Sequence, residues 1–179
     1  MYELFFEKIE EKIKLTSAQE DIIKQYLIPK KIRKNQYLLQ EGDVAKYAAF
    51  VEKGALRAYS VGDRGTEHII QFAFEGWTIS DMYSFLTGEA ATYNIDALED
   101  SELVLISKAA QDEILKQIPA YEVYTRLQVT GAYMAMQKRL TSMLSLSLEE
   151  RYINLTKLYP SLMQRVPQRM IASYMGLTP

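Results

Sequence analysis

The sequence predicts an α+β protein in which a jelly roll of short antiparallel strands lies between N-terminal helices and a helical C-terminal part. Between about residues 36 and 108, short aromatic and β-branched segments alternate with glycine-containing turns, which is typical of strands. Before residue 29 and after residue 109, apolar residues recur at helical spacing instead. Several short strands at this spacing favour a double-sheet roll.

The N-terminal part predicts two helices followed by the strands. Apolar residues recur at helical spacing from Leu4 to Ile13, and Thr16 with Gln19 forms a capping-box pattern before a second helix that ends near Pro29. The sequence DRG between two of the strands indicates a hairpin. The predicted strands are KYAAFVEK, ALRAYSV, TEHIIQFAF, TYNIDAL and SELVLISK.

An uninterrupted helix is predicted from about Tyr121 to Leu146, and it would be roughly 40 Å long. It carries two apolar stripes. Because the small roll can cover only one of them, we expect a parallel homodimer; a single helix buried inside one monomer is the alternative. One stripe contains Val129, Tyr133, Met136, Leu140 and Met143; the other contains Leu127, Met134, Thr141 and Leu148, beside Val123, Thr130, Gln137 and Leu144.

The C-terminal part predicts two short helices and the start of a third. One helix covers about residues 147–160, and VPQRMIASYM predicts another over 167–176. Thr178 followed by Pro179 has the pattern of a further helix beginning, with a hydroxyl N-cap and then proline. A helix, a glycine-containing turn and a new helix start are the layout of a helix-turn-helix.

Charge is distributed unevenly along the chain. The net charge is −2, but residues 1–137 hold 15 Lys and Arg against 21 Asp and Glu, whereas residues 138–179 hold six against two. An acidic first part and a basic last part indicate an effector region beside a polyanion-binding region. Scattered, solvated charges are the alternative.

Composition excludes several classes of site. The absence of cysteine excludes disulfides, thiolate metal sites and iron–sulfur clusters, and a single histidine, His68, cannot form a multi-histidine metal site. We therefore expect no metal and no certain cofactor. The sequence has no apolar run of membrane-spanning length and no signal-peptide pattern, so we expect a cytoplasmic protein without a membrane partner.

An enzyme is the less favoured interpretation. The carboxylates Asp63, Glu67, Glu75 and Asp81 lie near predicted strand ends and could in principle perform acid–base chemistry. However, no nucleophile–base pair and no glycine-rich phosphate loop accompanies them. We interpret them as solvated hairpin charges and expect no catalytic residues.

In this order of roll, long helix and basic helical tail, the chain resembles the cyclic-AMP receptor protein and Fnr (Crp/Fnr) superfamily of bacterial transcription regulators. The matching stretches are YLLQEGDVAKYAAFVEKGALRAY, with Gly42, Phe50, Val51 and Gly54, and RVPQRMIASYMGLT in the tail. The resemblance implies a cyclic-nucleotide-binding-like sensor domain over residues 1–118, a dimerisation helix over 119–146 and an incomplete winged helix-turn-helix DNA-binding domain over 147–179.

The resemblance also implies where double-stranded DNA would be contacted. The residues around the first motif helix that match the family pattern are Arg165, Gln168, Arg169, Ser173 and Thr178. The family's recognition helix would begin at Thr178, so we expect a truncated chain that binds specific DNA poorly. A free-standing sensor module that dimerises and touches no DNA is the alternative.

The small-molecule effector is expected in the stretch ISDMYSFLTGEAATYNIDAL. Family members that bind cyclic nucleotides carry there an acidic residue for the ribose and an Arg-Ser pair for the phosphate; Asp81 matches the first, but Ala91 and Thr92 occupy the second. RLQVT resembles the family stretch that places Thr130 near the base. A buried phosphate needs a compensating cation. We therefore expect no robust cyclic-AMP binding and a different, less anionic effector.

Overall fold

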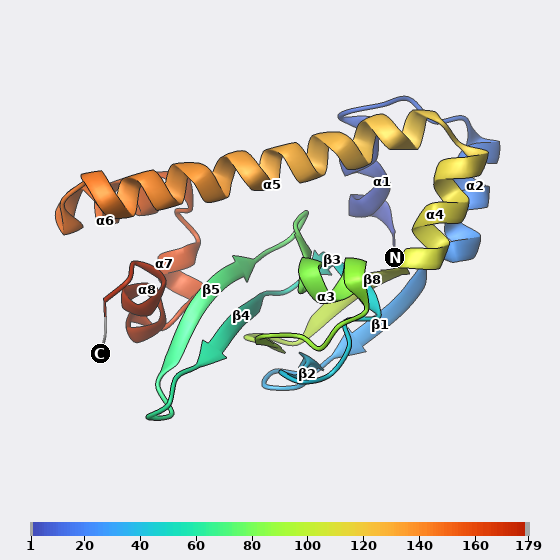
Figure 1. Cartoon of the computed structure of the whole chain (residues 1–179). Helices are drawn as coiled ribbons and strands as arrows, with labels where there is room; N and C mark the ends of the chain where they lie inside the picture. The colour runs from blue at the N-terminus through green and yellow to red at the C-terminus, as the bar shows by residue number, and fades with distance from the viewer. Residues whose placement is uncertain (1, 178–179) are drawn as a thin grey trace.

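The fold is seen in a computed structural model that describes residues 2–177 (Figure 1). Two four-stranded antiparallel sheets form the predicted jelly roll, in the orders β1-β8-β3-β6 and β2-β7-β4-β5. All five predicted strands and the β4–β5 hairpin are confirmed. The strands are β1 (Ile28–Ile32), β2 (Tyr37–Leu39), β3 (Tyr47–Lys53), β4 (Leu56–Val61), β5 (Glu67–Ala73), β6 (Thr78–Ile79), β7 (Asn94–Ala97) and β8 (Ser101–Ser107).

The two sheets face each other across an aliphatic core in which alanines alternate with larger side chains. Alanine lets the two short sheets approach closely, while the branched residues fill the space between them. The core residues are Ile32, Ala49, Val51, Leu56, Ala58, Ala73, Ile79, Ile95, Ala97, Leu103 and Leu105.

Strand β1 was not predicted. We interpreted Pro29 as the end of a helix, but it lies inside β1 and pairs with Val104 of β8. Strand β1 is at the edge of its sheet, where a residue without an N–H is tolerated. The edge position therefore explains why a proline-containing segment is extended here.

Helices cover one end of the roll. The predicted helices are α1 (Glu3–Glu10) and α2 (Ser17–Tyr26), and they pack with α4 (Lys108–Gln117). The capping box at Thr16 is confirmed. The backbone N of Thr16 donates to Gln19 Oε1 at 2.9 Å, and the hydroxyl of Thr16 accepts from Gln19 N at 3.3 Å. Phe5 packs edge-on against Phe50 of β3, which joins this helical cluster to the roll.

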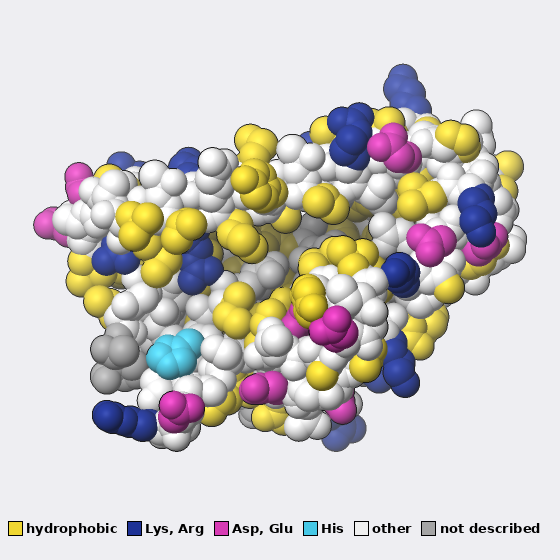
Figure 2. All heavy atoms as spheres, viewed as in Figure 1, with side chains coloured by type: hydrophobic (Ala, Val, Ile, Leu, Met, Phe, Trp, Pro, Cys, Tyr) yellow, Lys and Arg dark blue, Asp and Glu magenta, His cyan; other side chains and the backbone are white. Residues whose placement is uncertain are grey.

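The long helix α5 (Ala120–Ser145) is confirmed and runs over the roll (Figure 1). Within the helix only Tyr121 and Tyr124 are buried. Figure 2 shows apolar side chains gathered along it, and the exposed fractions reach 70% at Met136 and 81% at Leu144. The expectation that the roll covers one stripe is wrong within a single chain, because α5 is anchored near its ends and leaves both stripes uncovered.

Three C-terminal helices return to the roll (Figure 1). They are α6 (Leu148–Leu158), α7 (Leu162–Arg165) and α8 (Gln168–Tyr174); α7 was not predicted. They pack on the outer face of the β2-β7-β4-β5 sheet, and we call the buried residues there the outer-face cluster. It contains Ala55, Tyr59, Ile69, Phe72, Phe74, Leu155, Leu162, Val166, Ile171 and Met175.

Over residues 2–177, every helix is too short or too polar to cross a lipid bilayer.

Candidate functional site

A buried carboxylate organises the predicted effector segment. Asp81 is 1% exposed and caps the short helix α3 (Met82–Thr87), where its Oδ1 accepts from Ser84 N at 3.0 Å. Its Oδ2 accepts from the backbone N and the hydroxyl of Thr92, at 3.0 and 3.3 Å. Three donors thus satisfy this carboxylate, and none of them is a cation.

Ala91 closes the segment from the other side. Its N donates to Asp43 O at 2.7 Å, and its carbonyl accepts from Gly42 N at 2.9 Å. The Ala91 side chain is buried and has no polar atom. The structure therefore brings Asp81, Ala91 and Thr92 together, but the position matched to the phosphate-binding arginine supplies only a methyl group.

Further hydrogen bonds hold the segment in place. The Tyr93 hydroxyl donates to Ser80 O at 3.0 Å, and Ala45 N donates to Ser84 Oγ at 2.9 Å. Burial, together with the nearby charge of Asp81, raises the pKa of Tyr93 to about 12, so this phenol stays protonated at neutral pH.

Thr130 lies elsewhere. It is exposed on α5, and within residues 2–177 its side chain forms no hydrogen bond with Asp81, Ala91 or Thr92. A role for Thr130 in effector binding stays a prediction.

Arg165, at the end of α7, contacts the roll through two carboxylates. Its Nη1 and Nη2 donate to the two oxygens of Glu75 at 2.8 and 2.9 Å, and its Nε and Nη2 donate to Glu99 at 2.9 and 2.8 Å. The guanidinium also lies over the Phe74 ring at 5.1 Å. We call Arg165, Glu75 and Glu99 the clamp.

The contacts within the clamp shift the pKa values of its three side chains. Burial alone would raise the pKa of Glu75, but hydrogen bonds from Arg165 and the Gly54 amide outweigh it and hold the pKa below its usual range. The hydrogen bond from Arg165 likewise lowers the pKa of Glu99. Hydrogen bonds to Glu99 and Glu75 raise the pKa of Arg165. All three groups are charged at neutral pH.

Ser173 of α8 contacts the edge strand β5. Its hydroxyl donates to Glu67 O at 3.0 Å and accepts from Ile69 N at 2.9 Å. Arg139 of α5 donates to the carbonyls of Ile69 and Ile70 on the same strand. It also donates to Tyr174 O, and its guanidinium lies 3.8 Å from the centre of the Tyr174 ring. Sequence reasoning missed Arg139, because the long helix also carries Arg126 and Lys138 and nothing in the spacing distinguishes Arg139 from them.

The other predicted DNA-contacting residues differ from Arg165 and Ser173. Gln168 and Arg169 are exposed on α8, and neither contacts the roll through an ion pair or hydrogen bond within the described residues. Thr178 lies outside the described residues. Contact of these five residues with DNA stays a prediction.

Comparison with known proteins decides the family. The model of the family described as "Cyclic nucleotide-binding domain" matches residues 29–118, which is half of the chain and spans the roll from β1 to the end of α4. The chain belongs to the cyclic nucleotide-binding domain family.

Several solved structures are similar in fold to this cyclic nucleotide-binding domain protein over most of its length. Catabolite Activator Protein from Thermus thermophilus is 18% identical, with a TM-score of 0.58 over 92% of this chain and 78% of that chain. A protein from Eubacterium rectale assigned to the Crp/Fnr family of transcriptional regulators is 20% identical, with a TM-score of 0.67 over 91% and 78%. The c-di-GMP-responsive global regulator CLP of Xanthomonas campestris is 14% identical, with a TM-score of 0.67 over 91% and 86%.

These likenesses show the fold, which is that of the Crp/Fnr regulators: a roll, a long helix and further C-terminal helices. No protein of curated function matches the sequence significantly.

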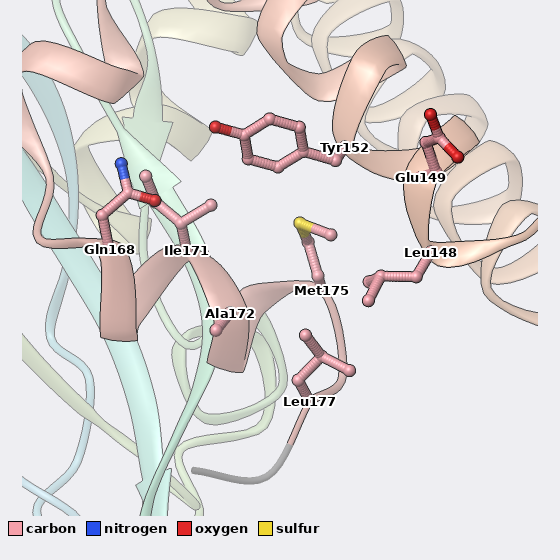
Figure 3. A pocket seen from close by; sticks show the side chains of 8 residues that line it. All are labelled: Leu148, Glu149, Tyr152, Gln168, Ile171, Ala172, Met175 and Leu177. Atoms are coloured by element: carbon pink, nitrogen blue, oxygen red, sulfur yellow. The ribbon is translucent and has the colours of Figure 1, made fainter.

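A groove lies between α6 and α8 of this cyclic nucleotide-binding domain protein (Figure 3). It has a volume of about 460 Å³ and a mostly apolar lining. The side chains that line it are Leu148, Glu149, Tyr152, Gln168, Ile171, Ala172, Met175 and Leu177.

Of the four carboxylates considered for acid–base chemistry, Asp63 is exposed in the β4–β5 hairpin, whereas the other three have structural contacts and are not solvated hairpin charges. Glu67 pairs with Arg57, which also binds Asp96; Glu75 belongs to the clamp; and Asp81 caps α3. Among residues 2–177, no three His, Asp or Glu side chains are placed to hold a metal ion.

Proposed function

We propose that the protein is a Crp/Fnr-type transcription regulator, in which an effector-sensing roll is coupled to a DNA-binding helix-turn-helix in a homodimer. The observation that carries this proposal is the single-chain order of roll, uncovered apolar helix and C-terminal helices. The Crp/Fnr protein from Eubacterium rectale matches that order over 91% of this chain.

The uncovered faces of α5 support the homodimer. Large apolar side chains that are more than half exposed recur along the helix at Val129, Tyr133, Met134, Met136, Leu140 and Leu144. A contiguous apolar surface of this kind marks an interaction site, and a second copy of the same helix offers a complementary apolar face. The two-fold axis would set the two recognition helices, and with them the DNA half-sites, about one duplex turn, roughly 34 Å, apart.

The C-terminal charge supports contact with DNA. Residues 138–179 carry six Lys and Arg against two Glu, and Arg169 is exposed at the start of α8. Contacts of this kind hold the phosphate backbone without choosing a sequence. The test is a gel shift of the full-length protein with duplex DNA at two salt concentrations. We expect binding that weakens steeply with salt, and absence of binding at low salt would overturn the DNA-binding role.

The effector is proposed to be a small molecule that is less anionic than a cyclic nucleotide. The donors that surround Asp81 are already occupied, and Ala91 supplies no cation for a phosphate. Burying an unpaired phosphate would cost several kcal/mol. Titration calorimetry with cyclic AMP and cyclic GMP should show no micromolar binding, and micromolar binding of either nucleotide would overturn this proposal.

A second candidate is a dimeric sensor module that does not bind DNA. The observation that favours it is that the polar groups of Arg165 and Ser173 are already hydrogen-bonded to the roll, which occupies the donors that DNA would need. The same gel shift separates the two candidates.

A further inference from the structure

The C-terminal helices are attached to the roll by polar contacts as well as by the outer-face cluster. Helix α7 is attached through the clamp, and α8 through Ser173. Arg139 of α5 donates both to β5 and to Tyr174, so it holds the end of α8 against the same strand. An apolar cluster alone tolerates sliding, whereas these directed contacts fix one position.

The clamp links three turns of the roll. Arg165 binds a carboxylate from each of two turns, and one of these carboxylates binds the third turn. Glu75 lies between β5 and β6, and Glu99 lies between β7 and β8. Glu75 Oε1 also accepts from Gly54 N at 2.8 Å, in the turn between β3 and β4. That turn is tight, since Gly54 has φ of +100° and a Cβ there would lie 2.2 Å from Ser101 Oγ. The geometry of the clamp therefore depends on the relative positions of these three turns.

Ser173 forms hydrogen bonds with the open edge of strand β5. Strand β5 is at the edge of the β2-β7-β4-β5 sheet, so its outward N–H and C=O groups lack a neighbouring strand. The Ser173 hydroxyl supplies one acceptor and one donor to this edge, and Arg139 supplies donors to the next carbonyls. Release of α8 would leave these backbone groups to water.

The clamp is close in the chain to the effector segment. Glu75 is followed by Trp77, which packs edge-on against Tyr159 after α6, then by β6 and Asp81. A rearrangement around Asp81 would thus move β6 and, through it, the Glu75 carboxylate that holds Arg165. Asp81 is six positions after Glu75 in the sequence.

We propose that the clamp is a lock that keeps α7 and α8 docked on the sensor roll, and that opening the clamp releases the two helices together. Its consequence for DNA rests on the proposed function, because Arg165 and Ser173 face the roll while the helices are docked. Docked and released helices are two states whose populations the roll can shift.

The test uses the natural absence of cysteine. Lys46→Cys on the roll and Gln164→Cys on α7 are both exposed positions, and spin labels there report the distance between the roll and α7. The lock is opened by Glu75→Gln with Glu99→Gln, which keeps side-chain size but removes both charges. Arg165→Lys is a second opening variant, because lysine cannot bind two carboxylates in the same bidentate manner.

The matched control removes two charges from exposed ion pairs that do not touch the C-terminal helices. It is Glu102→Gln with Glu113→Gln, whose partners are Lys31 and Lys116. Circular dichroism checks that every variant is folded. Hydrogen exchange at the Ile69 amide, which donates to Ser173, gives a second measure of release.

We expect one short distance in the parent and control, and a second, longer distance in both opening variants. The released-to-docked ratio should rise by about tenfold or more, since each variant weakens charge-assisted hydrogen bonds. Exchange at Ile69 should accelerate with it. An unchanged distance distribution and unchanged exchange in both opening variants would overturn the lock.

A gel shift on the same variants tests the DNA role separately. Release accompanied by tighter duplex binding than in the charge-matched control supports the lock and the regulator together. Release without any duplex binding supports the lock and removes the proposed DNA function of α8.

Discussion

Thr92 donates both its backbone N–H and its hydroxyl to one oxygen of the buried Asp81 carboxylate, at 3.0 and 3.3 Å. The acidic position of the effector segment and the position matched to a phosphate-binding side chain are therefore bonded to each other. The donors of Ser84 and Thr92 in this segment are hydrogen-bonded to the Asp81 carboxylate and need no ligand anion as an acceptor.

Replacing Asp81 should destabilise the roll. Asp81→Ala leaves the buried amide of Ser84 and the partly buried amide of Thr92 without their acceptor, so we expect a loss of about 2 kcal/mol in the free energy of unfolding. Urea denaturation measures it. The control Asp63→Ala, in the exposed β4–β5 hairpin, should change stability by less than about 0.5 kcal/mol. Equal stability of the two variants would contradict this role.

The clamp should make stability fall in acid. The pKa values of Glu75 and Glu99 are lowered in the folded protein, so the charged forms stabilise it above the ordinary carboxyl value of 4.5. That contribution is lost as the pH falls from 4.5 through the folded values. Urea midpoints measured from pH 7 to pH 3 should drop more steeply in the parent than in Glu75→Gln/Glu99→Gln. Identical profiles would show that the clamp contributes nothing.

A charge placed on the apolar face of α5 should weaken the proposed homodimer. Leu144 is 81% exposed, so Leu144→Lys should leave the folded chain stable while weakening self-association about tenfold or more. Sedimentation equilibrium measures the association. Ser145→Lys adds the same charge next to it, outside both stripes, and should have a smaller effect. If Leu144→Lys associates as tightly as the parent, α5 is not the interface.

The sequence predicted most elements whose signals are local. The capping-box pattern of Thr16 with Gln19 marked a helix start that the structure confirms, and the helix predicted from about residue 147 begins there as α6. Glycine-separated, β-branched segments marked five strands. Strand β1 was missed because Pro29 is a strong break signal, and only the sheet edge makes it acceptable.

The contacts of the C-terminal helices could not be predicted in the same way. Arg165 pairs with carboxylates 90 and 66 residues away, and Ser173 binds backbone 104 and 106 residues away. No periodicity or spacing encodes such contacts. The sequence predicted a short helix near Arg165 and Ser173, but only the fold shows that both side chains face the roll.

The most direct test of the regulator is sedimentation velocity of the full-length protein mixed with a fluorescent duplex. If the protein is a dimeric DNA-binding regulator, two chains should sediment with one duplex, and the complex should dissociate as salt is raised. A protein that sediments as a monomer and leaves the duplex free at low salt would contradict the proposed function.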